Sequence, residues 1–303
     1  MNSRLFDKRK TACGVISVMP MPSPEELKAF YAQVYYQELP SATYSASYSE
    51  EELAHRRLRA ELLLFALAQV GVAGERHEPR MLEIGCGEGF LLQAAKDRGY
   101  LIKGVDFSDH GLRKFHPELL VNVEVGDAYK ILDRLLGEGK CFDICVMQNV
   151  LEHVIDPEAL LKKVRCILGS NGIVMVTVPN DFSPVQKRFM EKGLVDHEYW
   201  FHPPQHLHYF NVDTIKPFAA KCGFEVEDAF ADFPIDFFLF HPGSNYVQEP
   251  AQGKGAHQAR IMLDLLLAER GLGAYHAFCR AVTACGAGRN VTVSLRPLAG
   301  EDG

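Results

Sequence analysis

The feature that most constrains the fold is a glycine-rich turn that directly follows a short apolar segment. Met81–Ile84 is apolar apart from Glu83, and it leads into Gly85, Gly87 and Gly89 at alternate positions. Glycine lets a backbone turn tightly and lets a ligand approach without a Cβ in the way. The helical pattern that follows would offer free N–H groups and the positive end of its dipole. The turn therefore predicts a site for a nucleotide-derived cofactor.

The spacing of the glycines argues against a dinucleotide. The pattern Gly-x-Gly-x-x-Gly would need its last glycine at Phe90. In addition, Glu83 lies two residues before the first glycine, where a carboxylate would repel a pyrophosphate and attract a cationic amino-acid group. A nicotinamide-dependent oxidoreductase is therefore disfavoured. A glycine turn that merely connects a strand to a helix is the structural alternative.

Two further carboxylates follow the next two expected strands. Asp106 lies 21 residues after Gly85, close to the ~20-residue spacing at which a carboxylate binds ribose hydroxyls. Asp127 is placed to accept from an adenine amine, with Phe107 and Tyr129 as flat neighbours. Each carboxylate alone is equally compatible with a helix cap. Because ligands bind outside the carboxyl ends of parallel strands, the set predicts one nucleoside pocket.

Short apolar segments alternate with helical patterns between residues 79 and 232. This alternation is typical of βαβ units and a parallel sheet. The predicted fold class is α/β, with a Rossmann-like, mostly parallel sheet whose last strand pairs antiparallel with the strand before it. The expected strands are Met81–Ile84, Leu101–Asp106, Val121–Val125, Phe142–Met147, Ile173–Val178, Phe224–Phe230 and Asn290–Leu295.

Two regions flank or interrupt this pattern. Residues 1–78 are expected to be helical, because capping boxes at Ser23 and Ser49 open helices that reach about Tyr36 and about Gly71 or Gly74. The Tyr/Ser-rich segment 35–48 between them is a possible lid or a polar linker. Residues 79–303 are expected to form the main domain. Residues 234–288 would be a helical insertion, with helices near 257–270 and 274–284, because a structureless loop of that length is uncommon.

Composition limits the partners. The chain has 303 residues, with 32 Lys+Arg against 39 Asp+Glu and a net charge of −7, unlike the basic balance of nucleic-acid binders. The longest apolar run, Leu62–Ala68, is far shorter than the ~20 residues that span a bilayer. The eight cysteines contain no Cys-x-x-Cys pair. We expect a cytoplasmic chain that binds neither nucleic acid nor membrane, and the sequence leaves its oligomeric state open.

The motifs at residues 79–230 resemble those of the class I S-adenosylmethionine-dependent methyltransferases. The resemblance implies that S-adenosylmethionine is the cofactor, with the glycine loop and Glu83 at its methionine part, Asp106 at the ribose, and Asp127 at the adenine. Residues 142–154 resemble the fourth strand of the family and its following turn. The expected cofactor-binding residues are Glu83, Gly85, Cys86, Gly87, Gly89, Asp106, Phe107, Asp127, Ala128 and Gln148.

Methyl transfer to a hydroxyl also needs a base with a pKa near neutrality, which favours histidine. A histidine-rich segment, residues 197–210, follows the fifth expected strand, where the resembled family commonly builds its acceptor site. His206 and His208 have the same parity and would face one side of an extended segment. The candidate catalytic residues are His206, His208 and His153, with packing in a loop as the alternative. Asn180 and Asp181 are expected acceptor contacts.

A metal ion is not expected. Ubiquinone-pathway O-methyltransferases have a similar turn with an additional carboxylate at the position of Asn149, and some bind a divalent metal there. Here Glu152 and His153 stand without that carboxylate, and hard cations prefer oxygen anions. The downstream histidines have no nearby carboxylate or cysteine in the sequence to complete a zinc set.

The expected acceptor is a small polar molecule. The N-terminal region, residues 206–210 and the insertion resemble bacterial methyltransferases of sugar and surface-polysaccharide metabolism. That resemblance implies O-methylation of a sugar or nucleotide-sugar, with a phosphate or phosphoramidate capsule precursor as the alternative. A non-catalytic protein that binds S-adenosylmethionine is the alternative from another functional class.

Overall fold

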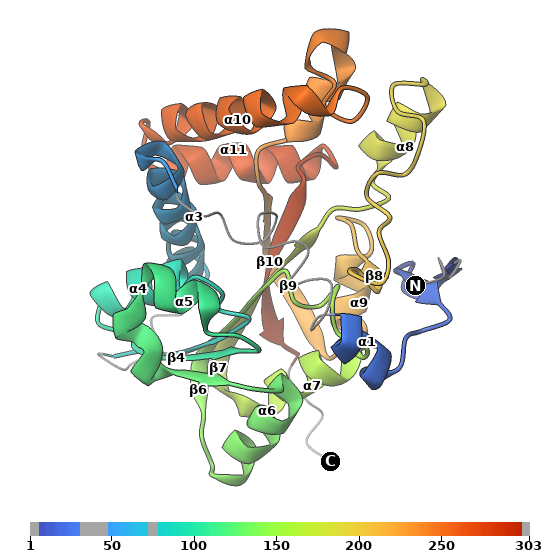
Figure 1. The fold of residues 1–303 in the computed structure, drawn as a ribbon. Coiled ribbons are helices and arrows are strands. Elements are labelled where there is room, and N and C mark those ends of the chain that lie inside the picture. The colour runs from blue at the N-terminus through green and yellow to red at the C-terminus, as the bar shows by residue number, and fades with distance from the viewer. Residues whose placement is uncertain (1–5, 31–47, 72–77, 299–303) are drawn as a thin grey trace.

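A seven-stranded sheet forms the centre of the computed structural model, which describes residues 6–30, 48–71 and 78–298 (Figure 1). Its strand order is β5-β4-β3-β6-β7-β10-β9. Neighbouring strands are parallel except β10, which is antiparallel to both β7 and β9. The predicted α/β fold is therefore confirmed. The strands are β3 (Arg80–Ile84), β4 (Leu101–Asp106), β5 (Val123–Val125), β6 (Phe142–Gln148), β7 (Leu168–Pro179), β9 (Phe224–Ala231) and β10 (Asn290–Pro297).

Helices cover both faces of this sheet, because successive strand residues point to opposite sides. Leu82 of β3 packs in the cluster that holds α6 (Ala128–Gly137), α7 (Pro157–Ile167) and α9 (Ile215–Lys221). Its neighbour Met81 packs in the opposite cluster. The helices of that second cluster are α3 (Glu50–Gln69), α4 (Phe90–Asp97), α5 (His110–Phe115) and α11 (Leu272–Ala284).

The two predicted capping boxes are present. Ser49 begins α3: its side chain accepts from the backbone of Glu52, and the Glu52 carboxylate accepts from the backbone of Ser49. Ser23 and Glu26 make the same pair of bonds at the start of α1 (Pro24–Phe30). Reciprocal caps of this kind satisfy N–H groups that have no partner within the helix. The remainder of the predicted first helix lies outside the described residues.

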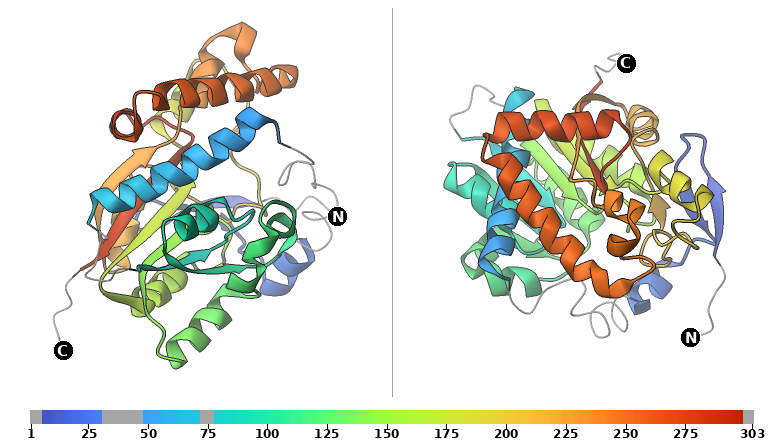
Figure 2. Two further views of the ribbon diagram at one scale, coloured as in Figure 1. Left: turned by 90° about the vertical axis from the view of Figure 1, so that its left-hand side faces the viewer. Right: turned by 90° about the horizontal axis from the view of Figure 1, so that it is seen from above.

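The stretch before the last strand is helical, as expected. Three short 3-10 turns, at Ile235–Phe240, Pro242–Ser244 and Pro250–Gln252, lead into α10 (Gly253–Ala268), and α11 follows. Figure 2 shows α10 and α11 together on the side of the molecule that carries α3, and both helices contact α3. The insertion therefore adds a helical layer next to the carboxyl edge of the sheet. A further helix, α8 (Pro184–Glu191), follows β7 in the chain.

The prediction that residues 1–78 are helical is wrong for residues 7–19. β1 (Asp7–Lys10) and β2 (Ile16–Met19) form a hairpin, and β2 pairs with β8 (His208–Tyr209) in a second, three-stranded sheet. The β1 strand is charged and exposed along its whole length, so it carries no alternating apolar pattern. Its sheet is completed by residues far away in the sequence, which local periodicity does not report. Most of the possible lid, residues 35–47, lies outside the described residues.

Among the helices of the described residues, none is long and apolar enough to cross a bilayer.

The small sheet holds the histidine-rich segment through a buried hydrogen bond. Ser17 Oγ of β2 lies 2.9 Å from His208 Nδ1. We expect Ser17→Ala to lower the free energy of unfolding by about 1–3 kcal/mol, because it leaves a buried imidazole nitrogen without its partner. Urea denaturation measures the change. The exposed Ser170→Ala is the control, and equal stability of the two variants would contradict the importance of this contact.

Candidate functional site

The glycine turn after β3 has a backbone that only glycine adopts easily. Gly85, Gly87 and Gly89 have φ values of +76°, +53° and +82°. A Cβ at Gly85 would lie 2.6 Å from a methyl of Val150, and one at Gly89 would lie 2.6 Å from a methyl of Leu112. At Gly87 no atom lies within 4 Å of such a Cβ. Two glycines thus allow close packing, and the third leaves open space for a ligand.

A pocket lies over this turn and is closed on one side by α3. It brings together six predicted cofactor-binding residues: Glu83, Gly85, Cys86, Gly87, Gly89 and Gln148. Two arginines that sequence analysis did not single out, Arg56 and Arg59 of α3, also line it. Their spacing places them on one face of the helix. That this face meets the glycine turn is a property of the tertiary structure.

Glu83 is a buried carboxyl group at the floor of this pocket. Its Oε1 accepts a hydrogen bond of 2.9 Å from Gln148 Nε2, whereas its Oε2 is buried without a partner. Burial raises the pKa of Glu83 to about 8; the neighbouring Asp106 adds to this rise and the bond from Gln148 opposes it. The group is therefore ready to ionise beside a cationic ligand. Burial also raises the pKa of the Cys86 thiol, so Cys86 is not a nucleophile.

Asp106 lies at the end of β4, directly beside the glycine turn. Its carboxylate accepts from the backbone N–H of Gly87 at 2.8 Å and of Ser108 at 3.0 Å. Burial raises its pKa in spite of these bonds. Two lone-pair directions remain for a ligand. Its neighbour Phe107 is 66% exposed, so its ring is free to stack on the adenine ring of a bound nucleoside, as the sequence predicts.

Asp127 caps a helix, which was the structural alternative for it. It precedes α6 and accepts from the backbone N–H of Lys130 at 3.0 Å. The preceding Gly126 donates to the carbonyl of Asp106 at 2.8 Å, so the ends of β4 and β5 are adjacent. Asp106, Phe107, Asp127 and Ala128 do not line the pocket described above. Their contacts with a nucleoside therefore stay predictions.

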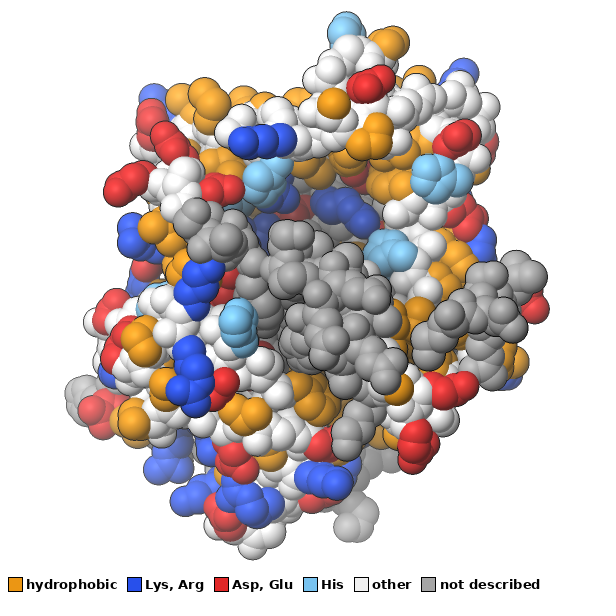
Figure 3. All heavy atoms as spheres, viewed as in Figure 1, with side chains coloured by type: hydrophobic (Ala, Val, Ile, Leu, Met, Phe, Trp, Pro, Cys, Tyr) orange, Lys and Arg blue, Asp and Glu red, His pale blue; other side chains and the backbone are white. Residues whose placement is uncertain are grey.

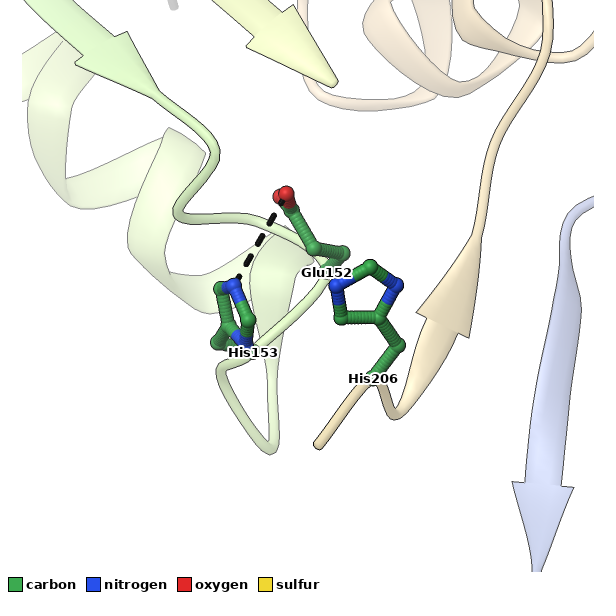
Figure 4. A group of neighbouring side chains, drawn as sticks. All are labelled: Glu152, His153 and His206. Carbon is green, nitrogen blue, oxygen red and sulfur yellow. Dashed lines mark ion pairs between the residues drawn. The ribbon is translucent and has the colours of Figure 1, made fainter. Parts of the chain in front are cut away.

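A second group of polar side chains meets near the turn that follows β6 (Figure 4). Glu152 and His153 come from this turn and His206 from the segment before β8, and one ligand atom of each lies within 4.8 Å of the others. Gln205 accepts from His153 Nδ1 at 2.7 Å, and Leu207 donates to the carbonyl of Glu152 at 2.7 Å. The sequence-based view that Glu152 and His153 stand without a third donor is therefore corrected. The reason is tertiary, since the two segments are 52 residues apart.

These three residues have the composition of a zinc-type donor set, two imidazoles and a carboxylate. Both oxygens of Glu152 are buried without hydrogen-bond partners. Burial, together with the charge of Asp181, raises the pKa of Glu152 to about 8. Burial, together with the nearby His206, lowers the pKa of His153 to about 3. The group is thus suited either to a divalent transition metal or to the movement of a proton.

Asp181, which follows β7, connects His206 to a buried cation. Its Oδ1 accepts a 2.6 Å hydrogen bond from Arg289 Nη1, and its Oδ2 lies 3.9 Å from His206 Nδ1. The second distance is that of an ion pair rather than a hydrogen bond. Burial opposes ionisation, but Arg289 and His206 together hold the pKa of Asp181 below its usual value. An ionised Asp181 favours the tautomer of His206 that carries its proton on Nδ1.

Two predicted site residues have no polar group left for a substrate. His208 Nδ1 bonds Ser17 Oγ at 2.9 Å, and its Nε2 bonds the carbonyl of Ile155 at 3.2 Å. Both ring nitrogens of His208 are therefore occupied, and we withdraw it as a candidate base. The amide of Asn180 bonds three backbone groups around the start of β10 and α9. Its role in this fold is therefore structural.

A family model described as a methyltransferase domain matches residues 48–229, more than half of the chain. Among curated proteins, a ubiquinone biosynthesis O-methyltransferase of Caulobacter sp. is 30% identical over 103 residues, 33% of this chain and 41% of the relative. The enzyme of the same name from Coxiella burnetii is 26% identical over 146 residues, 41% of this chain and 58% of the relative. The chain thus spans about half the length of the curated relatives it matches.

Two solved structures share the fold over nearly the whole chain. The 1,6-didemethyltoxoflavin-N1-methyltransferase of Burkholderia thailandensis, with bound S-adenosylhomocysteine, is 10% identical with a TM-score of 0.52, covering 97% of this chain and 100% of that one. The [4+2]-cyclase SpnF is 16% identical with a TM-score of 0.51, covering 93% and 99%. At such identities the likeness concerns the fold.

The buried Glu83 predicts a pH-dependent stability of the ligand-free protein. Its pKa is raised from 4.5 to about 8 in the folded state, so its contribution is complete below about pH 4.5 and is lost as the pH rises through 8. Between pH 5.5 and 8, we expect the wild type to lose at least about 1 kcal/mol more stability than Glu83→Gln. Urea denaturation at both pH values measures this. The exposed Glu225→Gln should follow the wild type, and parallel curves for all three proteins would contradict the shift.

Proposed function

Because the chain belongs to the class I S-adenosylmethionine-dependent methyltransferases, we propose that it transfers the methyl group of that cofactor to a hydroxyl of a small polar acceptor. The observation that carries the proposal is the buried pair of Asp181 and His206. The end of β6 and the turn after it also contribute Gln148 and Asn149 to the pocket over the glycine loop. Since Glu152 and His153 of the same turn lie beside His206, a base at His206 would lie near a cofactor held in this pocket, as O-methylation requires.

The pocket residues suit the parts of S-adenosylmethionine. One oxygen of Glu83 is buried without a hydrogen-bond partner. A cationic amino group beside it would stabilise the ionised carboxylate, which burial alone disfavours. We propose that Arg56 and Arg59 bind the carboxylate end of the methionine part from the side of α3, and that Asp106 binds the ribose. Asp127 and Ala128 would border the adenine. When bound, the cofactor supplies an electrophilic methyl group on a positively charged sulfur.

His206 is our candidate for the general base. With its Nδ1 toward Asp181, the Nε2 lone pair remains to accept a proton. The acceptor oxygen forms a bond to the methyl carbon as the bond from carbon to sulfur breaks, and the hydroxyl proton passes to His206 and then to solvent. Asp181 would hold the imidazole in place and stabilise its charged form. Burial lowers the pKa of His153 to about 3, which makes it a poor general base near neutral pH.

We retain a sugar or nucleotide-sugar of surface-polysaccharide biosynthesis as the proposed acceptor, and a phosphate or phosphoramidate capsule precursor as the alternative. The names of the relatives above support O-methylation but mention no sugar. Transfer of labelled methyl groups to nucleotide-sugars, phosphorylated precursors and phenolic acceptors compares these classes directly. Label in phenolic acceptors only would overturn the sugar proposal.

A protein that binds the cofactor without transferring its methyl group is the second candidate. We retain this candidate because the fold is similar to that of SpnF, which is described as a [4+2]-cyclase and not as a methyltransferase. A fold alone does not establish a reaction. Cofactor binding without any transfer from labelled S-adenosylmethionine, over the whole acceptor panel, would support this second candidate.

Asp106 tests the placement of the cofactor. We expect S-adenosylhomocysteine, but not NAD, to raise the melting temperature of the wild type. Asp106→Ala should weaken its binding by about 1.5–3 kcal/mol, because a charge-assisted hydrogen bond to the ribose is lost. Titration calorimetry measures the affinity. Asp133→Ala, which removes an exposed carboxylate of α6, is the matched control, and unchanged affinity in Asp106→Ala would place the ribose elsewhere.

His206 tests the proposed base. In His206→Gln, turnover should fall about 10²-fold or more while the affinity for S-adenosylhomocysteine is retained. The exposed His197→Gln is the control. Wild-type turnover in His206→Gln would exclude this residue.

A further inference from the structure

The group of Glu152, His153 and His206 contains a buried carboxylate whose hydrogen-bonding capacity is unused. Glu152 is 1% exposed, and neither of its side-chain oxygens has a hydrogen-bond partner among the described residues. His153 Nε2 lies 3.9 Å from its Oε1, which is beyond hydrogen-bond distance. A buried carboxylate without partners is costly, and a bound ion removes that cost. The carboxylate therefore points to a positively charged ligand in the middle of this group.

The ring of His153 is oriented as in a metal ligand. Its Nδ1 donates to the carbonyl of Gln205 at 2.7 Å, so Nδ1 carries the proton and Nε2 carries the lone pair. Nε2 is the atom that lies toward Glu152 (Figure 4). In metal sites, the second ring nitrogen of a histidine ligand usually donates to a carbonyl or a carboxylate, because this bond fixes the tautomer and the ring orientation.

His206 has the equivalent arrangement with a carboxylate. Its Nδ1 lies 3.9 Å from Asp181 Oδ2, and Asp181 is itself held by a 2.6 Å hydrogen bond from Arg289. Since Nδ1 lies toward Asp181, the ring nitrogen that faces Glu152 and His153 is Nε2 (Figure 4). Both histidines therefore present Nε2 to the unpartnered carboxylate.

Backbone hydrogen bonds fix the two segments that carry these donors relative to each other. Leu207 and His208 both donate to the carbonyl of Glu152, at 2.7 and 3.2 Å. One donor atom from each of the three side chains lies within 4.8 Å of the others. Tetrahedral bonds to zinc would separate such atoms by roughly 3.4 Å. Side-chain rotations on a fixed backbone are therefore sufficient to close the group around an ion.

We propose that Glu152, His153 and His206 bind a divalent transition metal, with zinc as the best match. Two imidazoles and one carboxylate are the protein ligands of several zinc sites, which keep a further position open for another ligand. Mg²⁺ is a poor match, because it prefers oxygen ligands. Asn149 of the same turn lines the pocket over the glycine turn, so the donor set combines two separate segments and does not come from the turn alone.

This site goes beyond methyl transfer but shares one atom with it. A general base and a metal ligand both need the lone pair of His206 Nε2. A bound metal ion and a proton taken from the acceptor therefore exclude each other at this atom. The metal-free protein is the form in which His206 can act as a base, whereas metal binding is measurable without any methyl acceptor.

Zinc binding to the full chain, without an affinity tag and after treatment with a chelator, tests the site. Calorimetry should show one Zn²⁺ bound per chain, in or below the micromolar range, and no binding of Mg²⁺. Glu152→Gln and His153→Gln should each weaken zinc binding about tenfold or more, because a ligand is lost. Cooperative urea unfolding shows that each variant is folded. No zinc binding to the wild type, or wild-type affinity in both variants, would overturn the proposal.

Surface histidines are the main alternative source of zinc binding. Figure 3 shows several histidine side chains on one face of the molecule. His197→Gln removes an exposed histidine of the same histidine-rich segment, so it is the matched control and should bind zinc like the wild type. A loss of affinity in His197→Gln equal to that in His153→Gln would place the ion on the surface and overturn the proposal.

Cobalt(II) reports the ligands directly. Bound Co²⁺ should show the intense visible absorption of a four- or five-coordinate ion, and Glu152→Gln and His153→Gln should lose it. The weak spectrum of the hydrated ion in the wild type would contradict the site. Failure of the methyltransferase function would appear separately, as absent methyl transfer by the metal-free wild type.

Discussion

The site depends on the way the glycine turn is held against the sheet. Gly85 donates to the carbonyl of Val105 at 2.7 Å, and Gly87 donates to the carboxylate of Asp106 at 2.8 Å. Cβ atoms at Gly85 and Gly89 would overlap the side chains of Val150 and Leu112. Only glycine at these two positions therefore lets the turn pack closely against its neighbours. The turn brings the N-terminus of α4 and the carboxyl ends of β3 and β4 to one point. Backbone N–H groups and the carboxyl groups of Glu83 and Asp106 therefore lie close together around this turn.

The other half of the site is organised by charge rather than by backbone shape. Asp181 and Asp232 lie 51 residues apart in the chain, yet the residue Arg289 contacts both, through its side chain and its backbone N–H. Burial strengthens these interactions, because few water molecules screen them. The start of β10 therefore connects Asp181, beside the proposed base, with Asp232, which pairs with Arg59 of α3. An antiparallel last strand is what delivers this residue to the carboxyl edge of the parallel strands.

Whether the sequence predicts a feature depends on how far apart in the chain its residues lie. The glycine turn and the capping boxes depend on residues within a few positions of one another, and both are present in the structure. Asp106 and Asp127 lie after their strands as expected, while their contacts with a nucleoside stay predictions. The pairing of β2 with β8, the meeting of His206 with Glu152, and the place of Arg289 depend on segments 50 to 190 residues apart. No local pattern encodes them. The prediction of His208 as a base fails for the same reason: its parity matches that of His206, but the N-terminal hairpin supplies its hydrogen-bond partner.

The buried charges of the pocket differ in how far the protein itself compensates them, and this difference constrains what binds. Arg59 lines the pocket and lies 3.4 Å from Asp232. Burial opposes its charge, but Asp232 and Asp264 raise its pKa, so its guanidinium already has counter-charges. Glu83 has no such partner: one of its oxygens is bonded only by the neutral amide of Gln148, and the other is buried without a hydrogen bond. A ligand that brings a positive ammonium group to Glu83 would supply the missing counter-charge, as the methionine part of S-adenosylmethionine can.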